Sequence, residues 1–214
     1  MTTIISFVSQ KGGVGKTTSA INLATAFAFG GYSVLLVDLD PQSSIRFSIG
    51  INNKIPVGTK ELFLNPEMSI EELVQDTDHE NMDFVFSNID TIGNEKSVYK
   101  IGDNAKFLKE RLEVASKNYD FVIVDAPAST NNMAVNAIYS SDLIILPLQC
   151  ESLAIKSLKR FLVAFNELQQ SLTDRKLRLA GILLTMYDRE MEVHRKVSQQ
   201  LYKALSDSVF ETII

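Results

Sequence analysis

Short apolar runs, each about the length of a β-strand, recur along the chain between segments of helical periodicity. The apolar runs are Thr3–Ser9, Ser33–Asp38, Tyr119–Asp125, Asp142–Pro147, Leu179–Met186 and Val209–Ile214. Apolar positions recur at helical spacing in residues 16–29, 104–117, 131–139, 152–172 and 190–205. Strands that are apolar on both faces and alternate with helices are typical of a covered parallel sheet. We therefore predict an α/β fold with a mostly parallel central sheet and helices on both faces.

Residues 51–103 interrupt this alternation. The segment is rich in Asn, Asp and Glu and only weakly periodic, and we expect it to hold two or three short elements. We interpret it as a variable excursion between the second and third main strands of a single domain, residues 1–214. Pro41, Pro127 and Pro147 lie at or just after strand ends, which form the ligand-binding edge of an open α/β sheet.

The composition is globular, with 45% hydrophobic residues, 22% charged residues and a net charge of −5. Cys150 is the one cysteine, so we exclude an internal disulfide and the iron–sulfur ATPases, which need paired cysteines. We interpret Cys150, His79 and His194 as surface or packing residues. The apolar runs are too short to cross a bilayer, and no basic segment precedes an apolar stretch at the start. We expect a cytoplasmic protein.

A glycine-rich loop lies between the first predicted strand and the first predicted helix. It consists of Lys11, Gly12, Gly13, Val14, Gly15, Lys16, Thr17 and Thr18. In this context, backbone N–H groups turn inward around an anion, and the positive end of the helix dipole points to the same place. We expect Lys16 to reach the β- and γ-phosphates of a nucleotide and the Thr17 hydroxyl to ligate Mg²⁺. Gln10 stands where the strict phosphate-loop motif has its first glycine.

The loop resembles the deviant Walker A motif of the ParA/MinD family of ATPases, because a second lysine, Lys11, opens it. Four further segments follow in the order that the family uses. Asp38–Gln42 resembles the DxDPQ segment of ParA and Soj, and Asp125–Pro127 resembles the Walker B segment. Pro147–Glu151 and Leu184–Asp188 resemble two later family segments. The resemblance therefore extends from the first residues to the end of the chain.

The resemblance implies a role for several residues. Lys11 would reach across a homodimer to the partner's nucleotide, with two ATP molecules sandwiched between the subunits, and Gly12 would leave room for the partner's loop. Asp40 would orient the attacking water, and Asp125 would hold Mg²⁺ through a water. The catalytic candidates are thus Lys11, Lys16 and Asp40, and the metal-site candidates are Thr17, Asp40 and Asp125. For Asp38 we favour a structural role.

The sequence departs from the family pattern at two further positions. Ala128 replaces the second proline of the Walker B segment. Glu190 stands where many ParA-like proteins carry an arginine tied to DNA binding, although Arg189 is adjacent. A basic strip on two predicted helices and the residue before the second is the other candidate for DNA contact; it comprises Lys156, Lys159, Arg160, Arg189, Arg195, Lys196 and Lys203. Such a strip is either a solvated face or a surface for DNA phosphates, without sequence specificity.

The resemblance favours an ATP-dependent partitioning switch for plasmids or chromosomes. Its ATP dimer would bind non-specific DNA on the nucleoid, and a ParB-like partner would stimulate slow hydrolysis. One alternative is a MinD-like membrane-associated ATPase, which needs a C-terminal amphipathic helix. Another is an amidoligase similar to cobyrinic acid a,c-diamide synthase. Val209–Ile214 ends the sequence, so we expect the family's adenine-contacting loop and last helix to be missing.

Overall fold

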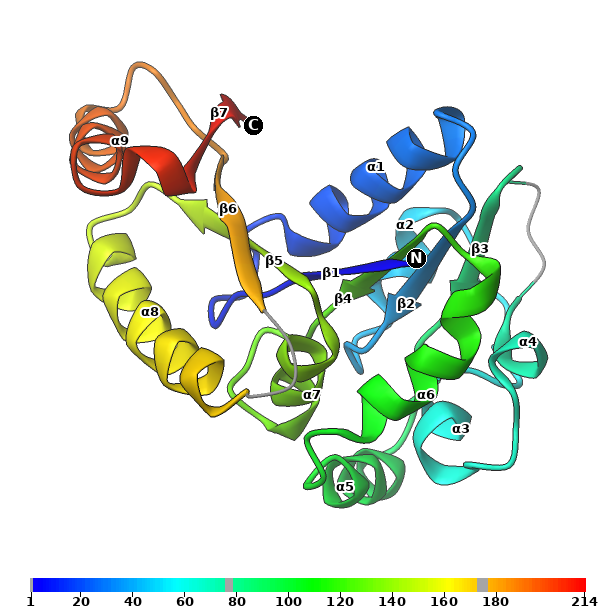
Figure 1. Cartoon of the computed structure of the whole chain (residues 1–214). Helices are drawn as coiled ribbons and strands as arrows, with labels where there is room; N and C mark the ends of the chain where they lie inside the picture. The colour runs from blue at the N-terminus through cyan, green and yellow to red at the C-terminus, as the bar shows by residue number, and fades with distance from the viewer. Residues whose placement is uncertain (1, 76–78, 173–176) are drawn as a thin grey trace.

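The computed structural model describes residues 2–75, 79–172 and 177–214, and within them seven strands form one sheet (Figure 1). The strand order is β3-β2-β4-β1-β5-β6-β7, and each of these pairings is parallel. The strands are β1 Thr3–Phe7, β2 Val34–Asp38, β3 Met82–Val85, β4 Phe121–Asp125, β5 Leu143–Gln149, β6 Arg178–Thr185 and β7 Val209–Ile213. The predicted α/β class and parallel sheet are confirmed.

Helices cover both faces of the sheet. They are α1 Lys16–Phe29, α2 Ser44–Ser48, α3 Thr59–Leu64, α4 Ile70–Leu73, α5 Ile92–Ile101, α6 Phe107–Ala115, α7 Asn132–Ser140, α8 Ala154–Ser171 and α9 Glu192–Leu205. The alternating side chains of β2 show why both faces need cover. Val34 and Leu36 pack in one core with residues of α1 and α2, whereas Leu35 and Val37 pack in the other core with residues of α3 and of α5 to α9. A strand without a polar face is stable only between two helical layers.

The excursion is more structured than its sequence predicts. It contains α3, α4, β3 and α5, and β3 forms a parallel edge strand beside β2. Our expectation of two or three short elements was therefore wrong. The strand Met82–Val85 escaped detection because it has four residues and an aspartate, too few for a clear period-2 pattern. The short helix α2 escaped detection for the same reason of length.

The excursion is attached to the carboxyl end of β2. The Thr59 hydroxyl donates a hydrogen bond of 2.5 Å to the Asp38 carbonyl oxygen, and the Thr59 amide donates to the Phe86 carbonyl oxygen at 3.0 Å. The backbone of Gly58 passes so close to this carbonyl that a Cβ on Gly58 would lie 2.1 Å from the Phe86 oxygen. Glu61, which is buried, accepts a hydrogen bond from the Gly58 amide at 3.0 Å. The segment that follows β2 is thus braced from outside.

Cys150, His79 and His194, which we interpreted as surface or packing residues, have different environments. Cys150 is fully buried, and burial raises the pKa of its thiol to about 11. His194 is also buried, and its Nδ1 accepts a hydrogen bond of 3.0 Å from the Asp188 amide. The His79 ring lies 5.9 Å from the Phe84 ring. In the part of the chain that the structure describes, no helix is both long and apolar enough to cross a membrane.

The close approach at Gly58 predicts a large effect of one methyl group. Gly58→Ala should lower the free energy of unfolding by about 1–3 kcal/mol, because the backbone carbonyl of Phe86 must move to admit a Cβ. Gly93→Ala in α5 is the matched control, since its Cβ would meet no described atom closer than 3.8 Å. Urea unfolding of both variants measures the difference, and equal stabilities would contradict the proposed brace.

Candidate nucleotide-binding site

The glycine loop connects the end of β1 to the first residue of α1. Gly13 and Gly15 have φ angles of +73° and +79°, in the left-handed region that other residues rarely adopt. Gly15 occupies the N-cap position of α1, so the free N–H groups of the first helical turn face the loop. The Thr185 hydroxyl, at the end of β6, donates a hydrogen bond of 2.9 Å to the Val14 carbonyl oxygen. The loop is therefore held by the sheet as well as by its own glycines.

Three predicted site residues meet beneath this loop. The Lys16 ammonium is buried and lies 4.0 Å from Asp125 Oδ1, and the Thr17 hydroxyl donates a hydrogen bond of 2.6 Å to Asp125 Oδ2. Parallel pairing of β1 with β4 causes this meeting, because Phe7 and Asp125 are partners at the carboxyl ends of the two strands. Thr18 follows on the exposed side of α1 and takes no part in the cluster. The structure thus brings together the lysine, hydroxyl and carboxylate that a Mg²⁺–phosphate site requires.

Asp125 carries more negative charge than its described neighbours neutralise. Its side chain is fully buried, and Oδ1 accepts no hydrogen bond from any described residue. Burial raises the pKa of Asp125 to about 6, against the opposing effects of the Lys16 charge and the Thr17 hydrogen bond. A buried carboxylate oxygen with an unused lone pair, beside a threonine hydroxyl, is a donor set that suits Mg²⁺. The residues present therefore fit the metal that the motif predicts.

A second buried aspartate organises the neighbouring loop. Asp38 is the strand partner of Asp125, and its two carboxylate oxygens accept hydrogen bonds from the backbone amides of Asp40 and Ile45 at 3.0 and 3.3 Å. Burial, and next the charge of Asp125, raises the pKa of Asp38. Asp40 is partly exposed, and its Oδ1 accepts from the Gln42 amide at 3.0 Å. Asp38 thus fixes the turn that presents Asp40, which supports a structural role for Asp38.

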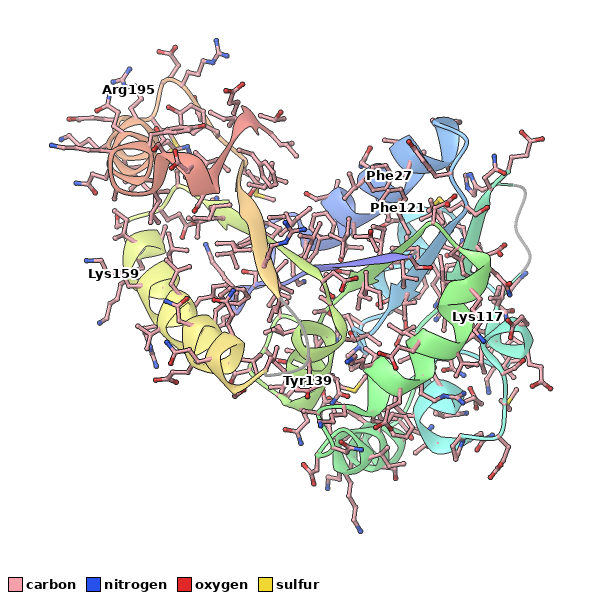
Figure 2. The ribbon with its side chains drawn as sticks, viewed as in Figure 1. Phe27, Lys117, Phe121, Tyr139, Lys159 and Arg195 are labelled. Atoms are coloured by element: carbon pink, nitrogen blue, oxygen red, sulfur yellow. The ribbon has the colours of Figure 1, made fainter. Side chains whose placement is uncertain are left out.

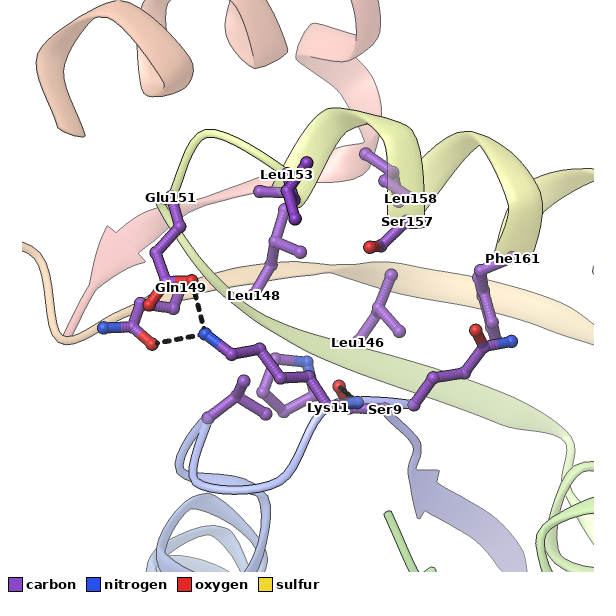
Figure 3. A pocket seen from close by; sticks show the side chains of 14 residues that line it. Ser9, Lys11, Leu146, Leu148, Gln149, Glu151, Leu153, Ser157, Leu158 and Phe161 are labelled. Carbon is purple, nitrogen blue, oxygen red and sulfur yellow. Dashed lines mark hydrogen bonds and ion pairs between the residues drawn. The ribbon is translucent and has the colours of Figure 1, made fainter. Parts of the chain in front are cut away.

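Lys11 does not join this cluster; its side chain extends toward Gln149 and Glu151 (Figure 3), at the end of β5, which flanks β1 on the side opposite β4. Its ammonium contacts Glu151 Oε2 at 2.5 Å and Gln149 Oε1 at 3.1 Å. These atoms lie at the mouth of a cavity of about 320 Å³, which is lined mainly by apolar residues from β5 and α8. Sequence reasoning did not identify the partners of Lys11. The available signal was their place at the carboxyl end of β5, the strand that neighbours β1.

The predicted basic strip lies on the outer surface of α8 and α9 and on the loop before α9. All seven of its residues are exposed, and Figure 2 shows Lys159 and Arg195 on the outer side of their helices. Two of its members already have partners in the chain: Lys196 pairs with Glu192 at 2.6 Å, and Arg195 donates to the Arg189 carbonyl oxygen at 3.3 Å. The strip is therefore exposed, and the charge of one member, Lys196, is partly neutralised within the chain.

The fold and this site together define a P-loop nucleoside triphosphatase, because a glycine loop joins a buried parallel strand to a helix that begins with Lys-Thr. A family model described as an AAA domain matches residues 2–179. The chain is 34% identical over 212 residues to the sporulation initiation inhibitor protein Soj of Bacillus subtilis, covering 99% of this chain and 83% of Soj. It is 33% identical over 213 residues to the chromosome partitioning protein ParA of Caulobacter vibrioides, covering 99% and 79%.

Solved structures agree with these relatives. Cobyrinic acid a,c-diamide synthase from Mycobacterium smegmatis, with a bound ATP analog and magnesium, superposes with a TM-score of 0.84 at 33% identity, covering 95% of this chain and 82% of that one. A plasmid partition protein from Borrelia burgdorferi bound to AMPPNP gives a TM-score of 0.74 at 27% identity, covering 96% and 81%. The chain belongs to the Soj/ParA family of partitioning ATPases, as the sequence motifs predicted.

The environment of Asp125 predicts that this residue lowers the stability of the nucleotide-free protein. Its pKa lies above that of an unfolded aspartate, so ionisation lowers the stability of the folded protein as the pH rises from about 4 through 6. Lys16, Thr17, Asp38 and Asp40 face this carboxyl group. Asp125→Asn should therefore stabilise the nucleotide-free protein at pH 7.5, by on the order of 1–3 kcal/mol.

Urea unfolding at pH 7.5 and pH 5 measures this effect, which should shrink at the lower pH. Asp207→Asn, at an exposed carboxylate, is the control and should change the stability little at either pH. An Asp125→Asn variant that is less stable than the wild type at pH 7.5 would contradict this account of the site.

Proposed function

We propose that this protein is an ATP-dependent switch of the Soj/ParA kind, which dimerises around ATP and acts in the partitioning of plasmids or chromosomes. The observation that carries the proposal is the cluster of Lys16, Thr17 and Asp125 beneath a glycine loop that also bears the exposed Lys11. The similarity to relatives named Soj and ParA supports the assignment to partitioning.

Each residue of the cluster has a task in binding Mg-ATP. The backbone amides of residues 12–18 surround the phosphates, and Lys16 neutralises charge at the β- and γ-phosphates. Thr17 and Asp125 would hold the metal, and the Thr17 hydroxyl would give up its present hydrogen bond to Asp125 for this role. When bound, Mg²⁺ would supply positive charge that stabilises the phosphate oxygens. Asp40 accepts a hydrogen bond from the attacking water and so orients it.

The dimer completes the site. Lys11 extends to the nucleotide bound by the partner subunit, where its charge lies between the two ATP molecules. A Cβ on Gly12 would meet no described atom of the same chain within 4 Å, so the need for glycine there comes from the approach of the partner's loop. We infer slow hydrolysis in the absence of an activator, because the residues assigned to the site include groups that position the nucleotide and the water but no arginine finger. The activator is a ParB-like protein.

The proposed cargo surface is the basic strip on α8 and α9. Dimerisation would place two such strips on one particle, and multivalent phosphate contacts with counterion release make weak patches effective. DNA binding through phosphates needs no base contacts, so it would be independent of sequence. The protein would then reside in the cytoplasm on the nucleoid.

ATP should convert the wild-type protein from monomer to dimer, which light scattering with Mg-ATP, Mg-ADP and no nucleotide detects. Lys16→Ala should bind no ATP by calorimetry and remain monomeric, because the charge at the phosphates is lost. Asp40→Ala should bind ATP, dimerise and stay trapped with ATP. A wild-type protein that remains monomeric at saturating ATP would refute the sandwich dimer.

DNA co-sedimentation should require ATP, ignore the DNA sequence and weaken as salt rises from about 50 to 200 mM. Arg195→Glu with Lys196→Glu should abolish DNA binding without affecting ATP affinity, because both residues lie on α9, outside the phosphate loop. The same protein is sedimented with anionic liposomes in the presence of ATP, ADP or no nucleotide as a parallel measurement. An ATP dimer that ignores DNA at low salt and sediments with liposomes would favour the MinD-like alternative.

A further inference from the structure

Lys11 is bound by residues of its own chain. It would have to leave these residues in order to reach the nucleotide of a partner subunit. Its ammonium contacts both the Glu151 carboxylate at 2.5 Å and the Gln149 amide oxygen at 3.1 Å (Figure 3). Both acceptors point at the same ammonium group, and the lysine and glutamate side chains are about half exposed, at 51% and 46%. The pair is therefore accessible to a competing anion.

The backbone fixes the two acceptors. Gln149 is the last residue of β5 and is paired with Thr185 of β6. The Glu151 amide donates to the Gln149 carbonyl oxygen at 2.8 Å, and the Ala154 amide donates to the Glu151 carbonyl oxygen at 3.0 Å. Glu151 thus lies on a tight turn that leads into α8, which begins at Ala154. The acceptors form a fixed receptor for the end of a flexible lysine side chain.

We propose that Glu151, assisted by Gln149, is an autoinhibitory latch that holds Lys11 within its own subunit and sets the ATP concentration at which the dimer forms. The inference rests on the proposed function, because it assumes that Lys11 engages the partner's nucleotide. A phosphate of the other subunit would compete with the Glu151 carboxylate for the same ammonium, and the two anions would repel each other, so both latches would open when two subunits close. Glu151 is in this respect a positioning residue that acts through Lys11.

The size of the effect follows from the exposure of the pair. Exposed ion pairs have coupling energies that correspond to about a two- to fivefold change in an equilibrium constant. Two latches open per dimer, so their contributions multiply. Glu151→Gln should therefore lower the dimer dissociation constant by roughly four- to twenty-fivefold, and this gain should fade at high salt.

Two measurements on the full chain test the latch. Sedimentation with Mg-AMPPNP, which avoids turnover, gives the dimer dissociation constant for wild type, Glu151→Gln and the control Glu192→Gln. The control removes the same charge from an exposed ion pair of 2.6 Å with Lys196, on α9, and no DNA is present. Trace acetylation of the nucleotide-free proteins, read by mass spectrometry, reports the freedom of the Lys11 amine, with Lys203 as the internal reference.

The latch predicts that Glu151→Gln both tightens the dimer and raises Lys11 acetylation about two- to fivefold, while Glu192→Gln changes neither. A tighter dimer with unchanged Lys11 acetylation would overturn it, because the carboxylate would then act through its general field. Unchanged dimerisation of Glu151→Gln would overturn it as well, and would leave the proposed function intact. If wild type binds AMPPNP but forms no dimer, the proposed function itself fails, and the latch fails with it.

Discussion

A buried carboxylate that lacks enough partners is the constraint on which the rest of this structure depends. Asp125 lies at the end of a central strand, where its Oδ1 accepts no hydrogen bond from a described residue and has the Lys16 ammonium only at 4.0 Å, and a carboxylate in that position lowers the stability of the fold. The surrounding elements limit this cost without removing it. Lys16 and Thr17 are the first residues of α1, and the glycine loop positions them against Asp125 at the end of β4. The opposing strand end contributes Asp38, whose oxygens are satisfied by backbone amides. The acceptor that lacks a hydrogen bond is therefore Asp125 Oδ1, an atom that a bound cation could contact.

The burial of the strands and the strength of the local sequence patterns explain which parts of the molecule could be predicted from the sequence. Central strands are apolar on both faces, so runs such as those around Val34 and Val122 marked the sheet directly, and the glycine loop marked the phosphate site. The edge strand β3 contributes buried core residues, but its four residues, one of them an aspartate, are too few to produce a recognisable strand pattern in the sequence. The partners of Lys11 were hidden for another reason. Hydrophobic periodicity places Glu151 at a strand end, but nothing in it reports which of several nearby charges a flexible lysine will choose.

The two lysines of the loop divide its chemistry between the interior and the surface. Lys16 is buried against Asp125 and belongs to the subunit's own site, whereas Lys11 is half exposed and held by Glu151. One loop thus carries a lysine for the nucleotide of its own subunit, Lys16, and a lysine that we propose for the nucleotide of the partner subunit, Lys11. A lysine with a weak, exposed acceptor can change partners readily, because such pairs contribute little to stability. A buried pair could not serve that purpose without a large cost in leaving a charge unpaired.

The attachment of the excursion to β2 has a consequence for how this chain can evolve. Long surface segments usually tolerate insertions and replacements, and residues 51–103 have the polar composition of such a segment. Yet Gly58 and Thr59 contact the Phe86 carbonyl and the Asp38 carbonyl, and through them the turn that presents Asp40. The segment also contributes core side chains such as Leu62 and Phe84, so drift is free only at its exposed positions and is restricted at the core positions and at this contact. Lineages can convert the exposed positions into new binding surfaces while inheriting the anchor that keeps the neighbouring turn in place.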